Sequence, residues 1–225
     1  MGRYNFDKIV DRKHTKSLKY DFAVQRGKPA DVLPFWVADM DFEIPSELKQ
    51  VLLDRVNHGI FGYTESDDAY FNVLKEWFAS RFNWNIDKKW LVKTPGVVFA
   101  LAMAVRAFTK EGEGVLINQP VYYPFSMVID DNDRNLINVP LIQGADTYTI
   151  DFEGVERAIV EHNVTLFLLC NPHNPVGRVW SEDELKRLGD ICIKHNVIII
   201  SDEIHADFVW DGHKHTVFAN LGESY

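Results

Sequence analysis

Apolar residues in the second half of the chain fall into short runs that alternate with amphipathic stretches. Runs that are apolar throughout are typical of strands buried on both faces of a parallel sheet. We expect such strands at residues 115–118, 136–141, 164–170 and 197–200. Helical periodicity between the runs predicts helices over residues 124–130, 152–162 and 181–195. The alternation indicates an α/β fold with a mostly parallel, mixed sheet covered by helices on both faces.

Helix signals also precede the first strand. Pro45-Ser46-Glu47 predicts the start of a helix, and Gly59 predicts its end. Much later in the chain, Ser181-x-x-Glu184 forms a capping box at the start of the last helix. A helix over residues 67–81 carries an apolar face that we interpret as packing surface, made of Tyr70, Phe71, Leu74, Trp77, Phe78 and Phe82. Residues 91–94 read as a short strand, and residues 97–109 as a buried helix because they are apolar nearly all round.

The first 45 residues differ from the rest, being polar and basic up to the compact segment 33–42. We interpret them as an extended N-terminal arm, and a solvated tail is the alternative. The start of the chain lacks the apolar core of a secretion signal. No apolar run approaches the roughly 20 residues of a membrane-spanning helix, so no membrane partner is expected.

Composition narrows the function classes further. With 46% hydrophobic and 25% charged residues, the 225-residue chain resembles an average globular protein. A net charge of −9 argues against nucleic acid as a partner, because phosphate backbones require a basic face. The two cysteines, Cys170 and Cys192, lie in apolar stretches and are expected to be buried free thiols, as in a reducing compartment. We therefore expect a cytoplasmic protein.

Candidate chemistry gathers where strands end, which is where α/β sheets bind ligands. Asp202 follows a buried apolar run, and a buried carboxylate requires a cation or several donors. A magnesium site of a nucleotide hydrolase would need a G-x-x-x-x-G-K-[ST] loop, and dinucleotide binding a G-x-G-x-x-G turn, neither of which occurs. A protonated heteroaromatic nitrogen such as a pyridinium remains, alongside a structural role such as helix capping.

Two loops add weaker signals. Gly96 separates the expected strand 91–94 from the apolar helix, where free N–H groups can bind an anion, although a plain turn gives the same pattern. Residues 171–177 contain two Asn-Pro steps, more constraint than an ordinary turn needs. His213 and His215 lie in a polar turn without further regularly spaced ligands, so we predict no metal site.

Four segments together resemble the fold-type-I pyridoxal-phosphate enzymes, and specifically the branch of cystathionine β-lyase and cystalysin-like C–S lyases. They are Trp36–Phe42 (W-V-A-D-M-D-F), Phe61-Gly62-Tyr63, Asn171–Gly177 (N-P-H-N-P-V-G) and Ser201–His205 (S-D-E-I-H). The resemblance implies an aspartate-aminotransferase-like large domain that binds pyridoxal 5'-phosphate. Residues 1–45 would be the arm with part of a small domain, and 46–225 an incomplete large domain, with most of the small domain missing.

The resemblance also assigns roles around the coenzyme ring. Asp202 would pair with the pyridinium nitrogen and Asn174 would donate to the 3-oxygen. His205 stands where aminotransferases usually have a tyrosine near that oxygen, a departure typical of the lyase branch. Tyr122 would stack on the ring face.

The remaining roles concern the phosphate and the covalent anchor. The backbone of Gly96, Val97 and Val98 would hold the phosphate, and Tyr63 would reach the phosphate of a neighbouring subunit, which implies a homodimer. The family's Schiff-base lysine would lie beyond Tyr225, so this chain is expected to hold no catalytic residue and to sustain no turnover by itself.

The implied activity of the parent enzyme is α,β-elimination from a sulfur amino acid, giving pyruvate, ammonia and a thiol. A pyridoxal-phosphate-dependent aminotransferase would share every residue discussed. A non-catalytic regulatory or binding protein is the alternative from another class.

Overall fold

The structure is a computed structural model that describes residues 4–225. The chain forms two compact units, Met1–Glu65 and Ser66–Tyr225. The second unit contains the parallel sheet and most of the predicted site residues, whereas Tyr63 belongs to the first.

The first unit has little regular structure. It contains α1 (Leu18–Asp21), a 3₁₀ turn at Val24–Arg26 and α2 (Ser46–His58), which ends at Gly59 with a positive φ of 74° as expected for a helix C-cap.

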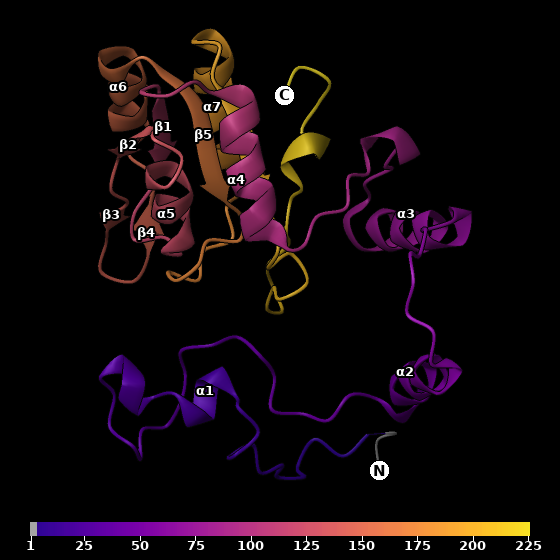
Figure 1. The fold of residues 1–225 in the computed structure, drawn as a ribbon. Helices are drawn as coiled ribbons and strands as arrows, with labels where there is room; N and C mark the ends of the chain where they lie inside the picture. The colour runs from indigo at the N-terminus through magenta and orange to yellow at the C-terminus, as the bar shows by residue number, and fades with distance from the viewer. Residues whose placement is uncertain (1–3) are drawn as a thin grey trace. The chain divides into compact units, whose positions relative to one another are not determined.

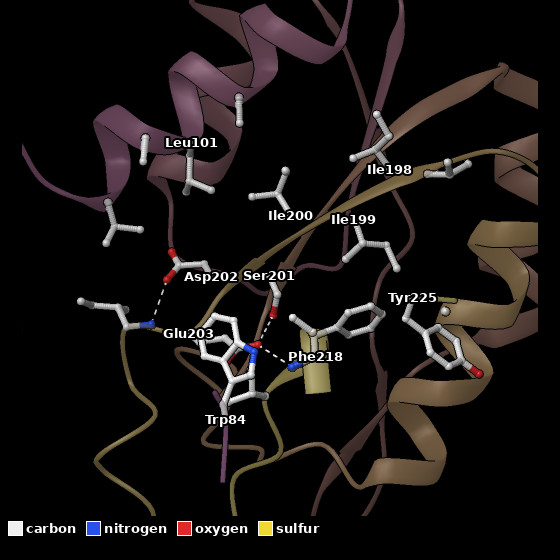
Figure 2. A pocket seen from close by; sticks show the side chains of 18 of the residues that line it. Trp84, Leu101, Ile198, Ile199, Ile200, Ser201, Asp202, Glu203, Phe218 and Tyr225 are labelled. Atoms are coloured by element: carbon white, nitrogen blue, oxygen red, sulfur yellow. Dashed lines mark hydrogen bonds between the residues drawn. The ribbon is translucent and has the colours of Figure 1, made fainter. Parts of the chain in front are cut away.

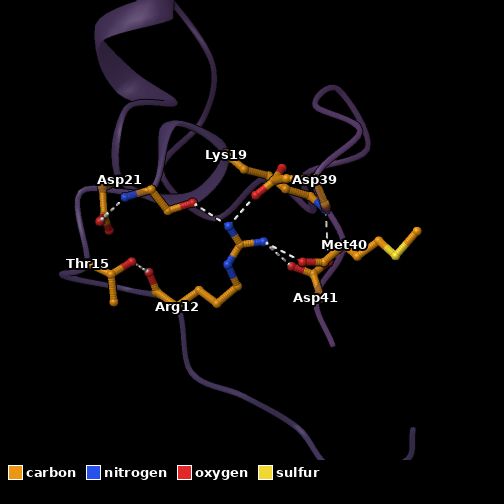
Figure 3. Close-up of polar contacts among 8 residues, drawn as sticks. Arg12, Thr15, Lys19, Asp21, Asp39, Met40 and Asp41 are labelled. Carbon is orange, nitrogen blue, oxygen red and sulfur yellow. Dashed lines mark hydrogen bonds and ion pairs between the residues drawn. The ribbon is translucent and has the colours of Figure 1, made fainter. Parts of the chain in front are cut away.

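A cluster of charged side chains ties the W-V-A-D-M-D-F segment to the beginning of the first unit (Figure 3). Arg12 contacts Asp39, and its Nη1 donates to Asp41 Oδ1 over 2.7 Å. Lys19 Nζ donates to Asp41 Oδ2 over 2.8 Å. Hydrogen bonds from Lys19 and Arg12 lower the pKa of Asp41 to about 2. The two acidic residues of the motif thus act as anchors of their own segment.

Four parallel strands form the sheet of the second unit in the order β2-β1-β5-β6 (Figure 1). Their bounds are Gly114–Ile117 for β1, Asn135–Asn138 for β2, Val164–Cys170 for β5 and Ile198–Asp202 for β6. All four predicted runs therefore contain strands: β5 has the predicted bounds, and the ends of the other three are shifted by one to three residues. Cys170 and Asp202 are register partners, so β5 and β6 end side by side.

Helices cover both faces of this sheet. On one face, α4 (Val97–Phe108) and α5 (Pro124–Asp130) pack on one another and on the strands. On the other lie α6 (Phe152–His162) and α7 (Glu182–Lys194), the latter opened by the predicted capping box of Ser181 and Glu184. The predicted α/β architecture is confirmed.

Side chains of β5 show how the two faces are filled. Leu166, Leu168 and Cys170 belong to the apolar cluster with α4 and α5, whereas Phe167 and Leu169 belong to the cluster with α6 and α7. This alternation is the two-residue period of a strand with helices on both sides. Both cysteines are buried and free, as predicted.

Two expectations were wrong in detail, and one element was missed. Residues 91–94 form no strand, because no described strand pairs with them; a 3₁₀ turn at Lys88–Trp90 precedes them instead. Helix α4 is not buried all round: Leu101 and Val105 are buried, but its outward face is exposed because no other element of the second unit covers it. A short antiparallel pair, β3 (Ile142–Gln143) with β4 (Tyr148–Thr149), was not predicted.

Helix α3 (Asp68–Phe82) forms as predicted and is capped by Asp67. Of its apolar face only Phe71 is buried. Its aromatic rings contact other aromatic rings, with the Phe78 and Trp84 centroids 5.3 Å apart and the Phe82 and His215 centroids 5.6 Å apart. None of the helices described in residues 4–225 is long and apolar enough to cross a membrane.

Candidate functional site

Asp202 lies at the carboxyl end of β6, on the face of the sheet that α4 covers. Its strand neighbour Ile200 packs with the α4 cluster, and side chains two residues apart share a face. Figure 2 shows the Asp202 carboxyl group pointing away from Ser201 and toward the side of Leu101. The β-strand therefore directs this acid into the space beneath α4.

The carboxyl group of Asp202 is buried, with 7% of the residue exposed, and lacks a cationic partner within hydrogen-bonding distance among the described residues. Its one hydrogen bond comes from the backbone N–H of Ile204, 3.1 Å from Oδ1. Burial raises the pKa of Asp202, and the Ile204 bond and the nearby His205 offset only part of this effect. Such a carboxylate is suited to accept a hydrogen bond from a positively charged N–H group of a ligand.

A cavity of about 830 Å³ opens beside β6, and Asp202 forms part of its wall (Figure 2). Helix α4 contributes Val97, Ala100 and Leu101, and β6 contributes its apolar run Ile198–Ile200. The lining is mostly apolar, so Asp202 is one of few groups there that can orient a polar ligand.

The first turn of α4 lies on the same cavity. Gly96 adopts φ 104° and ψ 159°, a backbone conformation that side-chain-bearing residues rarely adopt, and a Cβ there would meet nothing within 4 Å. No side chain caps the helix, so the N–H groups of its first turn remain available to an anion. Val97 and Asp202 line the same cavity, so the candidate anion site and the buried acid face one ligand-sized space.

The Asn-Pro loop and the loop after β1 are joined to one another. The backbone N–H of Tyr122 donates to the Asn174 carbonyl over 2.9 Å. The Tyr122 ring is partly exposed, and no hydrogen bond engages the side-chain amide of Asn174 within the described part of the chain. Both side chains are therefore free to contact a ligand. The Gln119–Pro120, Asn171–Pro172 and Asn174–Pro175 bonds are cis.

The structure thus brings the predicted residues together in two groups. Asp202 and Val97 line the same cavity, and Tyr122 and Asn174 are joined by a backbone hydrogen bond. His205 follows Asp202 closely, and its ring lies against Phe208 with centroids 6.4 Å apart. Val98 is exposed in the first turn of α4. Tyr63 is fully exposed in the first unit, and its contact with a neighbouring subunit stays a prediction.

Sequence reasoning missed Glu203, the neighbour of Asp202. Its carboxyl group accepts hydrogen bonds from Ser201 Oγ at 2.8 Å, the backbone N–H of Phe218 at 2.9 Å and His215 Nε2 at 3.0 Å. His215, which was predicted to lie in a polar turn, is only 4% exposed and lies against Glu203 and the Phe82 ring. The two-residue spacing between Ser201 near the end of β6 and Glu203 just beyond it was the available signal.

Comparisons with known proteins place these features in context. The family model for aminotransferase class I and II matches residues 30–224. Cystathionine beta-lyase PatB of Bacillus subtilis (strain 168) is 44% identical over 221 residues, which is 98% of this chain and 57% of PatB.

Solved structures give the same result. Cystalysin from Treponema denticola, which contains a pyridoxal 5'-phosphate cofactor, matches with a TM-score of 0.91 and 41% identity over 98% of this chain and 56% of its own. A pyridoxal-phosphate-bound C–S lyase from Staphylococcus hominis matches with a TM-score of 0.91 and 36% identity over 98% and 56%. The chain therefore spans a little more than half the length of these relatives.

Proposed function

Because this chain belongs to the aminotransferase class I and II family, we propose that it forms the coenzyme-binding part of a pyridoxal-phosphate-dependent C–S β-lyase. Residues 1–45 would be the N-terminal arm with part of the small domain, and residues 46–225 part of the large domain. The buried Asp202 carboxyl group, without a cation beside it and facing a cavity, carries this proposal. The names of PatB and of the C–S lyase structures support the lyase activity.

Asp202 fits the ring nitrogen of the coenzyme. A pyridinium N–H supplies the positive charge that the buried carboxylate otherwise lacks, and the carboxylate in turn keeps that proton on the ring. The bound coenzyme withdraws electrons from the substrate α-carbon, which is the chemistry an elimination requires. Asp202 would keep this proton on the ring nitrogen.

The other groups fit the remainder of the coenzyme. Backbone N–H groups at Val97 and Val98 would bind the phosphate at the open start of α4. Gly96 would line the same site with its backbone, although its own N–H donates to the Thr94 carbonyl over 2.8 Å. Tyr122 would cover one face of the ring. Asn174 would donate its unengaged amide to the 3-oxygen, with His205 near the same atom. Tyr63, exposed in the first unit, would bind the phosphate of a partner subunit in a homodimer.

The substrate is proposed to be a sulfur amino acid such as cystathionine, and the products pyruvate, ammonia and a thiol. No lysine of the described residues lines the cavity, and the chain spans a little more than half the length of its relatives. The lysine that carries the coenzyme covalently would therefore belong to the remaining part of the enzyme. The two buried free thiols agree with a reducing compartment such as the cytoplasm. A net charge of −9 does not favour nucleic acid as a partner.

Coenzyme titration tests the proposal directly. The 225-residue chain is titrated with pyridoxal phosphate while its absorbance band and the quenching of tryptophan fluorescence are recorded. Removing a hydrogen bond to a charged group costs about 1.5–3 kcal/mol, so Asp202→Ala should weaken binding about tenfold or more. Asp146→Ala, which removes an exposed acid from the β3–β4 turn, is the matched control and should bind normally. Equal affinity of the Asp202 and Asp146 variants would refute the role of Asp202.

The name of the family makes an aminotransferase the alternative activity. The reaction products distinguish an aminotransferase from a lyase. The enzyme carrying these residues and its lysine is supplied with cystathionine. Release of pyruvate and ammonia supports the lyase, whereas a new oxo acid formed with pyridoxamine phosphate supports the aminotransferase.

A further inference from the structure

His173 lies in the middle of the N-P-H-N-P loop, and neither the coenzyme-binding roles nor the fold explain it. It is 3% exposed. Its backbone N–H donates to the Arg178 carbonyl over 2.7 Å, and its carbonyl accepts from the N–H of Gly177 over 2.9 Å. Its ring meets the Trp180 ring edge-on, with centroids 5.4 Å apart. Both the backbone and the ring of this residue are therefore fixed to the body of the second unit.

The one hydrogen bond of the His173 side chain crosses to the other ligand loop. Nε2 lies 3.0 Å from the carbonyl oxygen of Pro120, which precedes Tyr122 by two residues. In the opposite direction, the N–H of Tyr122 donates to the carbonyl of Asn174. Two crossed hydrogen bonds thus join the loops, and only the one from His173 depends on a side chain.

The ring is suited to a fixed, uncharged contact. Burial lowers the pKa of His173, and nearby backbone carbonyls offset only part of that effect, so the ring is neutral at physiological pH. A carbonyl oxygen can only accept, so the single proton lies on Nε2. Nδ1 is buried without a hydrogen-bond partner in the described residues. The hydrogen bond to Pro120 is therefore the one polar contact of this side chain there.

We propose that His173 is a positioning residue that sets the height of the Tyr122 ring above the coenzyme by tying the Tyr122 loop to the Asn174 loop. The inference rests on the proposed function, because it assumes that Tyr122 and Asn174 contact one ligand. Rigid support of a contacting group by a buried neighbour is what a binding site requires to hold its geometry.

Two substitutions separate the hydrogen bond from the bulk of the ring. His173→Gln places an amide N–H near the Nε2 position and keeps the bond, whereas His173→Leu fills the space without a donor. His213→Leu, in an exposed loop, is the matched control. Hydrogen exchange of the Tyr122 amide is measured without coenzyme, with the Leu166 amide in β5 reporting global opening. Coenzyme affinity and the circular dichroism of the bound pyridoxal band are measured in parallel.

We expect His173→Leu to speed exchange at Tyr122 about tenfold or more relative to Leu166, as expected for a lost buried hydrogen bond. The coenzyme dissociation constant should rise about tenfold and the dichroic band should change, while His173→Gln and His213→Leu resemble the unsubstituted chain. Parallel changes at Tyr122 and Leu166, or an unchanged dichroic band in a His173→Leu protein that binds coenzyme, would overturn the inference. Failure of the unsubstituted chain to bind coenzyme would count against the proposed function alone, because the exchange data still report on the loop contact.

Discussion

Replacing Glu203 should destabilise the second unit by an amount that the structure allows to be worked out. The side chain accepts three hydrogen bonds, two of them from donors with little access to water, the His215 ring and the Phe218 N–H. A buried donor left without an acceptor costs about 1–3 kcal/mol. The Ser201 hydroxyl is less buried and can turn to water, so its loss adds little.

We therefore expect Glu203→Ala to lower the free energy of unfolding by about 3 kcal/mol, from two unsatisfied donors at somewhat under the middle of that range each. Glu203→Gln keeps one acceptor oxygen and should cost about half as much. Because whole domains are stable by about 5–15 kcal/mol, the alanine variant should remain folded but be clearly weakened.

Urea unfolding followed by tryptophan fluorescence measures these changes, provided that the denaturant slope stays constant between variants. Glu161→Ala, at an exposed position of α6, is the control for the same chemical change and should leave the midpoint unaltered. If Glu203→Ala differs from that control by less than about 0.5 kcal/mol, the range of ordinary surface substitutions, then the hydrogen bonds seen at Glu203 do not hold the segment after β6.

Three further predictions concern titration. Burial raises the pKa of Cys170 and Cys192 to about 12, so both thiols should react slowly with a disulfide reagent at pH 8 and fast in urea; fast native labelling would contradict their burial. The pKa of Asp41, lowered to about 2 by Lys19 and Arg12, should move toward about 4 in Lys19→Met when followed by carboxyl carbon NMR. Its stabilising effect is complete above the unfolded pKa and is lost as the pH falls toward 2. The pKa of Asp202 is raised by burial, so its contribution is lost as the pH rises; Asp202→Asn should therefore raise the melting temperature of the coenzyme-free chain at pH 8, with a smaller gain toward pH 4.

Hydrophobic periodicity predicted most accurately the helices and strands whose apolar positions are also their buried positions. Helices α5 and α6 and strand β5 have the predicted bounds, because their apolar spacing coincides with the buried positions. Residues 91–94 look equally strand-like, but a strand exists only when another strand pairs with it, and pairing is not encoded locally. The apolar content of α4 likewise could not show which of its faces the sheet covers.

The candidate site divides in the same way. Asp202 was predictable because an acid after an apolar run is a local feature. His173 and Glu203 were not, because their partners are distant in sequence: Pro120 lies 53 residues before His173, and His215 lies 12 residues after Glu203. A single sequence does not reveal such pairs, even though both residues lie in segments that carry the family resemblance, N-P-H-N-P-V-G and S-D-E-I-H.

These two residues share an arrangement with the ligand residues beside them. Each is the chain neighbour of a residue assigned to the coenzyme, Glu203 next to Asp202 and His173 next to Asn174. Asp202 and Glu203 both line the cavity, but only Glu203 is held by side-chain hydrogen bonds, from His215 and the Phe218 N–H. Asn174 has an unengaged amide, while His173 binds the Pro120 carbonyl. The rigidity of each ligand contact thus depends on a buried hydrogen bond one residue away. Substitutions at Glu203 and His173 should therefore alter coenzyme geometry while every contacting side chain is still present, an effect that a list of ligand contacts would not predict.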